Sequence, residues 1–171
     1  MKRSIAIIII IIIIVLTIFF IPIFTQFTIS NGETGDVVFC GSPEKYEQFY
    51  ISFIHSANRT PVYEYYKTIG EKFIAYKTTF YSYGAGMPDG SDNPDAEFSF
   101  KNGQVQIDNI NKELDEFTVL VGTCADHTLH VGNESFKLEE YIEPQHPATF
   151  SIKKVSIYTI SRRFILWVTK N

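Results

Sequence analysis

Basic residues are scarce in most of this sequence. Of its 15 Lys and Arg, two lie within the first three positions, which leaves 13 against 19 Asp and Glu beyond residue 29. Nucleic-acid binders need clustered Lys and Arg to neutralise phosphates, so this acidic balance argues against that class of partner. The chain beyond residue 29 also contains all ten tyrosines, and this aromatic content argues against intrinsic disorder. At 171 residues the chain has the length of one folded domain.

Charge is absent altogether from residues 4–32, and residues 7–14 are isoleucines without interruption. The apolar stretch 5–24 would form a helix about 30 Å long, which is the thickness of the hydrocarbon core of a bilayer. Lys2 and Arg3 precede it, and basic residues stay on the cytoplasmic side of a membrane. The sequence therefore predicts a single-pass anchor in the cell membrane, with the N-terminus inside and the rest of the chain outside.

A cleaved signal peptide is the competing interpretation. The apolar core of a signal peptide is usually about 7–15 residues long and ends in a small-x-small site. Here the apolar run extends from Ile5 to the residue before Pro22, and the candidate cleavage sites at 28–30 and 30–32 contain no alanine. An uncleaved anchor fits these features better.

After residue 32 the pattern changes to short alternating apolar runs separated by turn residues, without an amphipathic helix or a strand–helix alternation. Asn102-Gly103 and Gly132-Asn133 are typical of tight hairpin turns, which need residues that tolerate positive φ. The pattern predicts an all-β fold, either an antiparallel β-sandwich or an open barrel. The expected strands cover residues 36–40, 48–55, 61–68, 72–82, 97–100, 104–108, 117–121, 127–131, 134–138, 150–160 and 164–169, with one helical turn at 109–116.

The predicted organisation follows from these boundaries. It consists of a cytoplasmic N-terminus, a transmembrane anchor, a linker and an extracytoplasmic β domain, over residues 1–4, 5–24, 25–35 and 36–171 respectively. The longest loop of the β domain, residues 84–94, is rich in Gly, Asp and Pro.

Two motifs in the β domain are specific in combination. A strand ending in His55-Ser56 is followed by a turn and by Pro61-Val62-Tyr63-Glu64, and Ser82-Tyr83-Gly84-Ala85-Gly86-Met87-Pro88 comes after the next strand. With these motifs, the sequence resembles the domain-of-unknown-function 1850 family over roughly residues 36–155. Further matching positions are Asn111, residues 117–121 and His127-Thr128-Leu129.

The resemblance implies a small bacterial protein that is exported or membrane-anchored and has no established activity. Members of the family tend to be encoded beside the components of tripartite transporters. The resemblance therefore implies an accessory role in such a transporter, and we expect an anchored interaction module that contacts transporter subunits. The tail past Val155 departs from the family pattern.

His55 and Glu64 are candidate ligand-binding residues. Their strands are joined by a short turn, so we expect the two side chains to be neighbours at one end of the sheet. Gly84 and Gly86 should lie at the same end, where their backbone N–H groups could bind an anion. The alternative function is thus a small-anion or metal-binding module. Structural roles remain open, with the pair buttressing the turn and the glycines forming a tight β corner.

A metal site built from His55, Glu64 and His127 is a weaker hypothesis, because these residues lack a recognised ligand spacing. His127 and His130 are three positions apart, so on a strand they face opposite sides and cannot share a metal ion. The sequence indicates no cofactor.

Catalytic motifs are missing from the sequence. It contains no Gly-x-Ser-x-Gly nucleophile elbow, and no other catalytic constellation stands out, so we do not expect an enzyme. Cys40 and Cys124 are the two cysteines. A domain outside the cytoplasm would allow them to form a disulfide.

Overall fold

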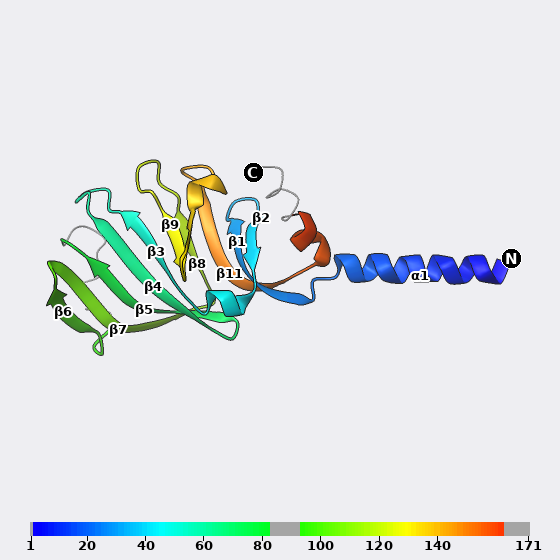
Figure 1. Ribbon diagram of the computed structural model, residues 1–171, viewed down its shortest axis with the longest axis horizontal. Helices are drawn as coiled ribbons and strands as arrows, with labels where there is room; N and C mark the ends of the chain where they lie inside the picture. Colours follow the sequence, from blue (N-terminus) through cyan, green and yellow to red (C-terminus); the bar gives the residue numbers. More distant parts are fainter. Residues whose placement is uncertain (1, 83–92, 163–171) are drawn as a thin grey trace.

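Two antiparallel sheets make up the β domain in the computed structural model, which describes residues 2–82 and 93–162 (Figure 1). The smaller sheet has four strands in the order β2-β1-β11-β8, and the larger has seven in the order β10-β9-β3-β4-β5-β7-β6. The predicted all-β antiparallel class is confirmed. Strands β6 and β7 lie at the end of the domain farthest from the N-terminal helix α1.

The strands follow one another with few interruptions along the chain. Their bounds are β1 Phe24–Asn31, β2 Val37–Gly41, β3 Gln48–Ile54, β4 Pro61–Ile69, β5 Lys72–Phe80, β6 Glu97–Lys101, β7 Gln104–Leu114, β8 Glu116–Leu120, β9 Thr128–Val131, β10 Glu134–Lys137 and β11 Pro147–Val155. Two short 3₁₀ helices are η1 Pro43–Tyr46 and η2 Leu138–Glu140.

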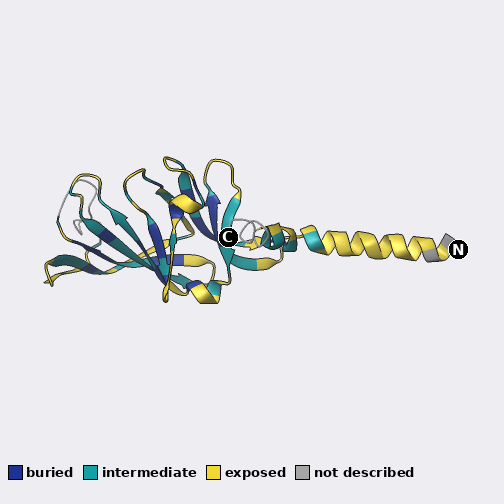
Figure 2. Cartoon of the chain, turned by 45° about the horizontal axis from the view of Figure 1, so that its top comes forward, coloured by how far each residue is buried: buried dark blue, intermediate teal, exposed yellow. Residues whose placement is uncertain are grey.

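Helix α1, Lys2–Phe20, projects away from the β domain as a single straight element (Figure 1). Figure 2 shows it as almost entirely exposed. The consecutive residues Ile9, Ile10, Ile11 and Ile12 together cover all sides of the helix, and each exposes 51–55% of its surface. Among the described residues, no helix meets the combined requirements of length and apolarity for a membrane crossing.

The prediction of a linker over residues 25–35 is wrong, because most of that segment is strand β1. It pairs along its whole length with β11, from Phe24 opposite Val155 to Asn31 opposite Ala148. Strand β1 is also an inner strand, with β2 on its other side. Alternation of Phe27 with polar neighbours marks a strand, but the apolar run that precedes it masks this signal. The β domain therefore begins at residue 24, and only three residues separate it from the end of α1.

Two further expectations need correction. The helical turn expected at 109–116 is instead the second half of β7, which continues to Leu114. The chain accommodates an irregularity in β7 through positive φ values at Asn109 and Asn111, both residues that tolerate this conformation. The strand expected at 150–160 ends at Val155, and residues 157–162 are helical. The strand expected at 164–169 lies outside the described residues.

The core lies between the two sheets and is rich in aromatic rings. Phe117 of β8 stacks on Tyr66 of β4 at 4.4 Å and on Phe150 of β11 at 4.6 Å between ring centroids. The contact between Phe117 and Tyr66 joins the two sheets, whereas Phe117 and Phe150 are neighbours on adjacent strands of the smaller sheet. Such aromatic pairs stabilise a core beyond the burial of their area. A second, smaller cluster on the seven-stranded sheet is centred on the buried side chains Val62, Phe80 and Ile107.

Candidate functional site

Glu64 lies on β4, the central strand of the seven-stranded sheet. Its side chain is on the inner face, because Val62 and Tyr66, two positions away on either side, are buried in the core. It stands opposite Ile51 of β3 and Thr78 of β5. From edge to edge this row of the sheet consists of Phe136, Leu129, Ile51, Glu64, Thr78, Ile107 and Phe98. One carboxyl group thus interrupts a mostly apolar row.

The Glu64 carboxyl accepts a hydrogen bond from Tyr66. The Tyr66 hydroxyl is 2.9 Å from Oε2 of Glu64. Burial raises the pKa of Glu64 because it disfavours the charged form, and the hydrogen bond from Tyr66 partly opposes this effect by lowering the pKa. Burial likewise raises the pKa of the Tyr66 hydroxyl, as does the nearby Glu64 charge. The pair is therefore a carboxyl group hydrogen-bonded to a phenol in a mostly apolar row, which is a poor environment for an anionic ligand.

His55 follows the last residue of β3 and organises the turn to β4. Its Nδ1 accepts a hydrogen bond of 3.2 Å from the backbone N–H of Asn58. Its own backbone N–H donates to the Thr60 carbonyl at 2.9 Å, and its carbonyl accepts from Arg59 at 2.8 Å. Arg59 takes a positive φ of 53° at this turn. These bonds support the interpretation of His55 as a turn-stabilising residue.

The prediction that His55 and Glu64 are neighbours is wrong. Glu64 stands opposite Ile51, four residues before His55 on the neighbouring strand. At about 3.4 Å per residue this register places them roughly 14 Å apart along the sheet. The error arises because Glu64 lies four residues beyond the turn, in the middle of the sheet, and not at its end.

Gly84 and Gly86 lie outside the described residues. The start of their segment does approach the turn, because the side-chain amide of Asn58 donates a hydrogen bond of 3.1 Å to the Ser82 carbonyl. The turn after β3 and the chain after β5 therefore meet at one end of the sheet, as the alternation of antiparallel connections predicts.

His127 and His130 contact opposite faces of the seven-stranded sheet. His127 stacks on Phe53 of the smaller core cluster, with 5.2 Å between ring centroids, and its Nδ1 accepts from the Gly122 N–H at 3.2 Å. Burial lowers the pKa of His127, against a smaller opposing effect of Asp126. Within the described part of the chain, no three His, Cys, Asp or Glu side chains are grouped to hold a metal ion, so His55, Glu64 and His127 form no such set there.

Cys40 and Cys124 are thiols in the structure and form no disulfide with each other. Cys40 lies on β2, and Cys124 lies in the loop after β8. These strands occupy opposite edges of the four-stranded sheet, with β1 and β11 between them. Three strand spacings of about 4.8 Å therefore separate β2 from β8, whereas the two Cβ atoms of a disulfide must lie within about 4.5 Å of each other.

The outer face of the seven-stranded sheet carries a group of partly exposed aromatic rings that sequence reasoning missed. We call this group the tyrosine face. Tyr50 is its centre: its ring centroid lies 4.4 Å from His130, 5.2 Å from Tyr65 and 6.2 Å from Tyr63. Tyr76 extends the group beyond Tyr65 at 6.3 Å. The tyrosines two positions apart on the predicted strand 61–68 were the available signal.

Polar groups are interspersed with these rings. The Lys77 ammonium lies 4.8 Å from the centroid of Tyr65, and that of Lys67 lies 5.9 Å from Tyr76. His130 Nε2 is 2.8 Å from the Ser52 hydroxyl. Burial lowers the pKa of His130, which favours its neutral form. The tyrosine face is therefore aromatic, rich in hydroxyl groups and flanked by two cations.

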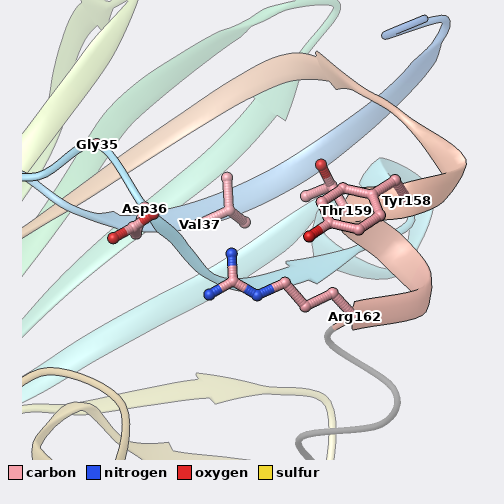
Figure 3. Close-up of a pocket in the computed structure, with 6 residues that line it drawn as sticks. All are labelled: Gly35, Asp36, Val37, Tyr158, Thr159 and Arg162. Atoms are coloured by element: carbon pink, nitrogen blue, oxygen red, sulfur yellow. The ribbon is translucent and has the colours of Figure 1, made fainter. Parts of the chain in front are cut away.

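A pocket of about 210 Å³, drawn with its lining residues in Figure 3, lies at the end of the β domain that contacts α1. It lies between the turn that joins β1 to β2 and the helical segment 157–162. Its lining residues are Gly35, Asp36, Val37, Tyr158, Thr159 and Arg162. Tyr158 also contacts the end of α1, with its ring centroid 5.2 Å from that of Phe20 and 6.1 Å from that of Phe19.

Comparison with known proteins identifies the family and nothing more specific. The family model described as a domain of unknown function (DUF1850) matches residues 49–138, slightly more than half of the chain. No curated protein and no solved structure matches the chain. The matched segment begins in β3 and ends after β10, so it includes the His55 turn, Glu64 and the tyrosine face. The chain therefore belongs to the DUF1850 family.

Proposed function

We propose that the protein is a membrane-anchored interaction module, whose β domain presents the tyrosine face to a protein partner outside the cytoplasm. The observation that carries this proposal is the exposed apolar surface of α1. Large apolar side chains from Ile5 to Phe24 are exposed along the segment, and the β domain covers almost none of them. A helix that is apolar on all sides is stable only when it is buried, and a lipid bilayer would bury it.

The distribution of charge supports an orientation with the N-terminus inside. Lys2 and Arg3 precede the apolar segment, whereas the first basic residue after it is Lys45. The intervening residues carry Glu33, Asp36 and Glu44. Orientation in membranes follows Lys and Arg close to the ends of the span, so this asymmetry favours an extracytoplasmic β domain.

The tyrosine face supports the choice of an interaction role. Tyrosine provides a large, rigid contact surface together with a hydroxyl group, and it is enriched at protein interfaces. On β4 the face uses Tyr63 and Tyr65, whose neighbours Val62 and Tyr66 point into the core. The family resemblance motivates the choice of partner, which we propose to be a subunit of a tripartite transporter.

We do not extend the proposal to a small-anion or metal site at His55 and Glu64. Their register separates them by roughly 14 Å. The hydrogen bonds of His55 serve the turn, and Glu64 is bonded to Tyr66.

Photo-crosslinking in intact cells tests the proposal. A photoreactive phenylalanine analogue would replace Tyr65 on the tyrosine face, and in a matched control it would replace Leu120, which is 62% exposed on the other sheet. We expect a discrete adduct from position 65 and none from position 120, with a transporter subunit identified in the adduct by mass spectrometry. Equal adducts from both positions would contradict the interaction role. A different captured protein, seen only from position 65, would contradict the transporter assignment alone.

A further inference from the structure

We propose that the pocket beside α1 binds a phospholipid headgroup that carries both a phosphate and an ammonium group, namely phosphoethanolamine. This inference rests on the proposed membrane anchor, and it adds a lipid ligand that the anchor alone does not require.

The pocket lies beside the C-terminal end of α1. Tyr158, which lines the pocket, packs on Phe19 and Phe20 in the last turn of α1. Only three residues connect α1 to β1, so the β domain is held close to the helix end. If α1 is embedded in lipid, its C-terminal end lies at the outer surface of the bilayer, where tyrosine is enriched and where headgroups are found.

The lining combines one cation with one anion. Arg162 offers a planar guanidinium with several N–H donors, a geometry suited to two oxygens of a phosphate. Figure 3 shows this side chain extending beneath Val37 toward Asp36. Oδ2 of Asp36 accepts a hydrogen bond of 3.1 Å from the Thr34 hydroxyl. A carboxylate has capacity for further donors, so Asp36 can also accept from an ammonium group.

These two charges select the headgroup chemistry. A purely anionic headgroup would be attracted by Arg162 and repelled by Asp36. A headgroup with a phosphate and a short ammonium arm satisfies both, and a primary ammonium donates hydrogen bonds that a quaternary one lacks. The volume of the pocket is about 210 Å³. It therefore has room for a headgroup and leaves the acyl chains in the bilayer.

Calorimetric titration of the full chain in detergent tests the pocket. The probe is glycerophosphoethanolamine, compared with glycerophosphoglycerol, glycerophosphocholine and inorganic phosphate. Loss of a charge-assisted pair corresponds to about tenfold weaker binding, so Arg162→Ala should weaken glycerophosphoethanolamine binding about tenfold. The matched control is Arg59→Ala in the turn after β3, which should bind like the wild type. Asp36→Asn should remove the preference for the ethanolamine form over the glycerol form.

Several outcomes would overturn the inference. Equal binding by the Arg162→Ala and Arg59→Ala variants would show that Arg162 is not part of the site. Inorganic phosphate bound as tightly as glycerophosphoethanolamine would show a phosphate site and no headgroup site. Flotation of the wild-type chain with vesicles is measured separately. A chain that floats but fails the titration refutes the pocket alone, whereas a chain that does not float refutes the anchor. Thermal unfolding of each variant checks that the domain remains folded.

Discussion

The Tyr66 hydroxyl donates a hydrogen bond of 2.9 Å to Glu64 in the middle of the seven-stranded sheet. Both side chains point to the inner face, and Tyr66 continues into a stack with Phe117 of the other sheet. The bond thus places the one carboxyl group of its row next to the aromatic core. Because burial raises the pKa of Glu64, this carboxyl makes the stability of the domain depend on pH.

Glu64→Gln should flatten this pH dependence. A raised pKa means that the folded state binds the proton more tightly than the unfolded state, whose value is near 4.5. The stabilisation from the proton is fully present below about pH 4.5 and is lost as the pH rises through the higher folded pKa. The amide of Gln still accepts the bond from Tyr66 and never ionises. Urea unfolding of the full chain in detergent, repeated across this pH range, should show a decline for the wild type and none for the variant. The exposed Glu97→Gln serves as the control, and a decline that survives in Glu64→Gln would contradict the assignment.

Tyr66→Phe should destabilise the domain by about 1–3 kcal/mol, because it leaves the partly buried carboxyl of Glu64 without its donor. The same change should raise the pKa of Glu64 further, since the hydrogen bond from Tyr66 lowers it. Denaturant unfolding gives the first quantity, and carbon-13 NMR titration of the Glu64 carboxyl gives the second. Tyr76→Phe on the tyrosine face is the matched control, for which we expect a much smaller loss. An unchanged Glu64 titration in Tyr66→Phe would rule out the role of this bond.

Phe27→Ala should cost about 3–5 kcal/mol of unfolding free energy, as is usual for removing a core aromatic ring. Phe27 is fully buried in β1 and stacks on Tyr46 at 4.3 Å between centroids. The matched control is Phe24→Ala at the exposed start of the same strand.

A chain that begins at Asp36 should fail to fold, because it lacks an inner strand of the four-stranded sheet. Folding of that shortened chain would mean that residues 24–31 act only as a linker.

Thiol titration of the denatured, unreduced protein should detect two thiols, since Cys40 lies on one edge strand of the four-stranded sheet and Cys124 follows the strand at the opposite edge. In the folded protein Cys124 should react with iodoacetamide faster than Cys40, because Cys124 is exposed and Cys40 is partly buried. Mass spectrometry of the alkylated peptides gives both rates. Recovery of a peptide that joins the two cysteines would contradict the strand arrangement.

The sequence supports the strand prediction where apolar and polar residues alternate between turn residues. Strands β3, β4 and β6 start at or near their predicted residues for this reason, and the hairpin at Asn102-Gly103 joins β6 to β7. Strand β1 was hidden because it directly follows an apolar run, so the change of period is difficult to see.

Sites that tertiary contacts assemble are harder to predict from the sequence. The pocket joins Asp36 to Arg162 from distant parts of the chain, and no local pattern links them. The position of Glu64 depends on the strand register, which a single sequence does not specify. Each residue along a strand changes the distance from the turn by about 3.4 Å, so four residues change it by more than 10 Å.

Labelling of Cys124 in intact cells is the most direct test of an anchored domain that faces outward. Cys124 is exposed on the β domain, so a membrane-impermeant maleimide should reach it without lysis if the domain is extracytoplasmic. The Cys40→Ser variant leaves Cys124 as the single thiol, and adding Ser4→Cys to a Cys40→Ser, Cys124→Ser chain provides the inside control. We expect Cys124 to be labelled in intact cells, and the labelled protein to remain in the membrane pellet after alkaline carbonate extraction. The thiol introduced at position 4 should be labelled only after lysis. Cys124 that reacts only after lysis, or protein that carbonate releases from the pellet, would contradict the account.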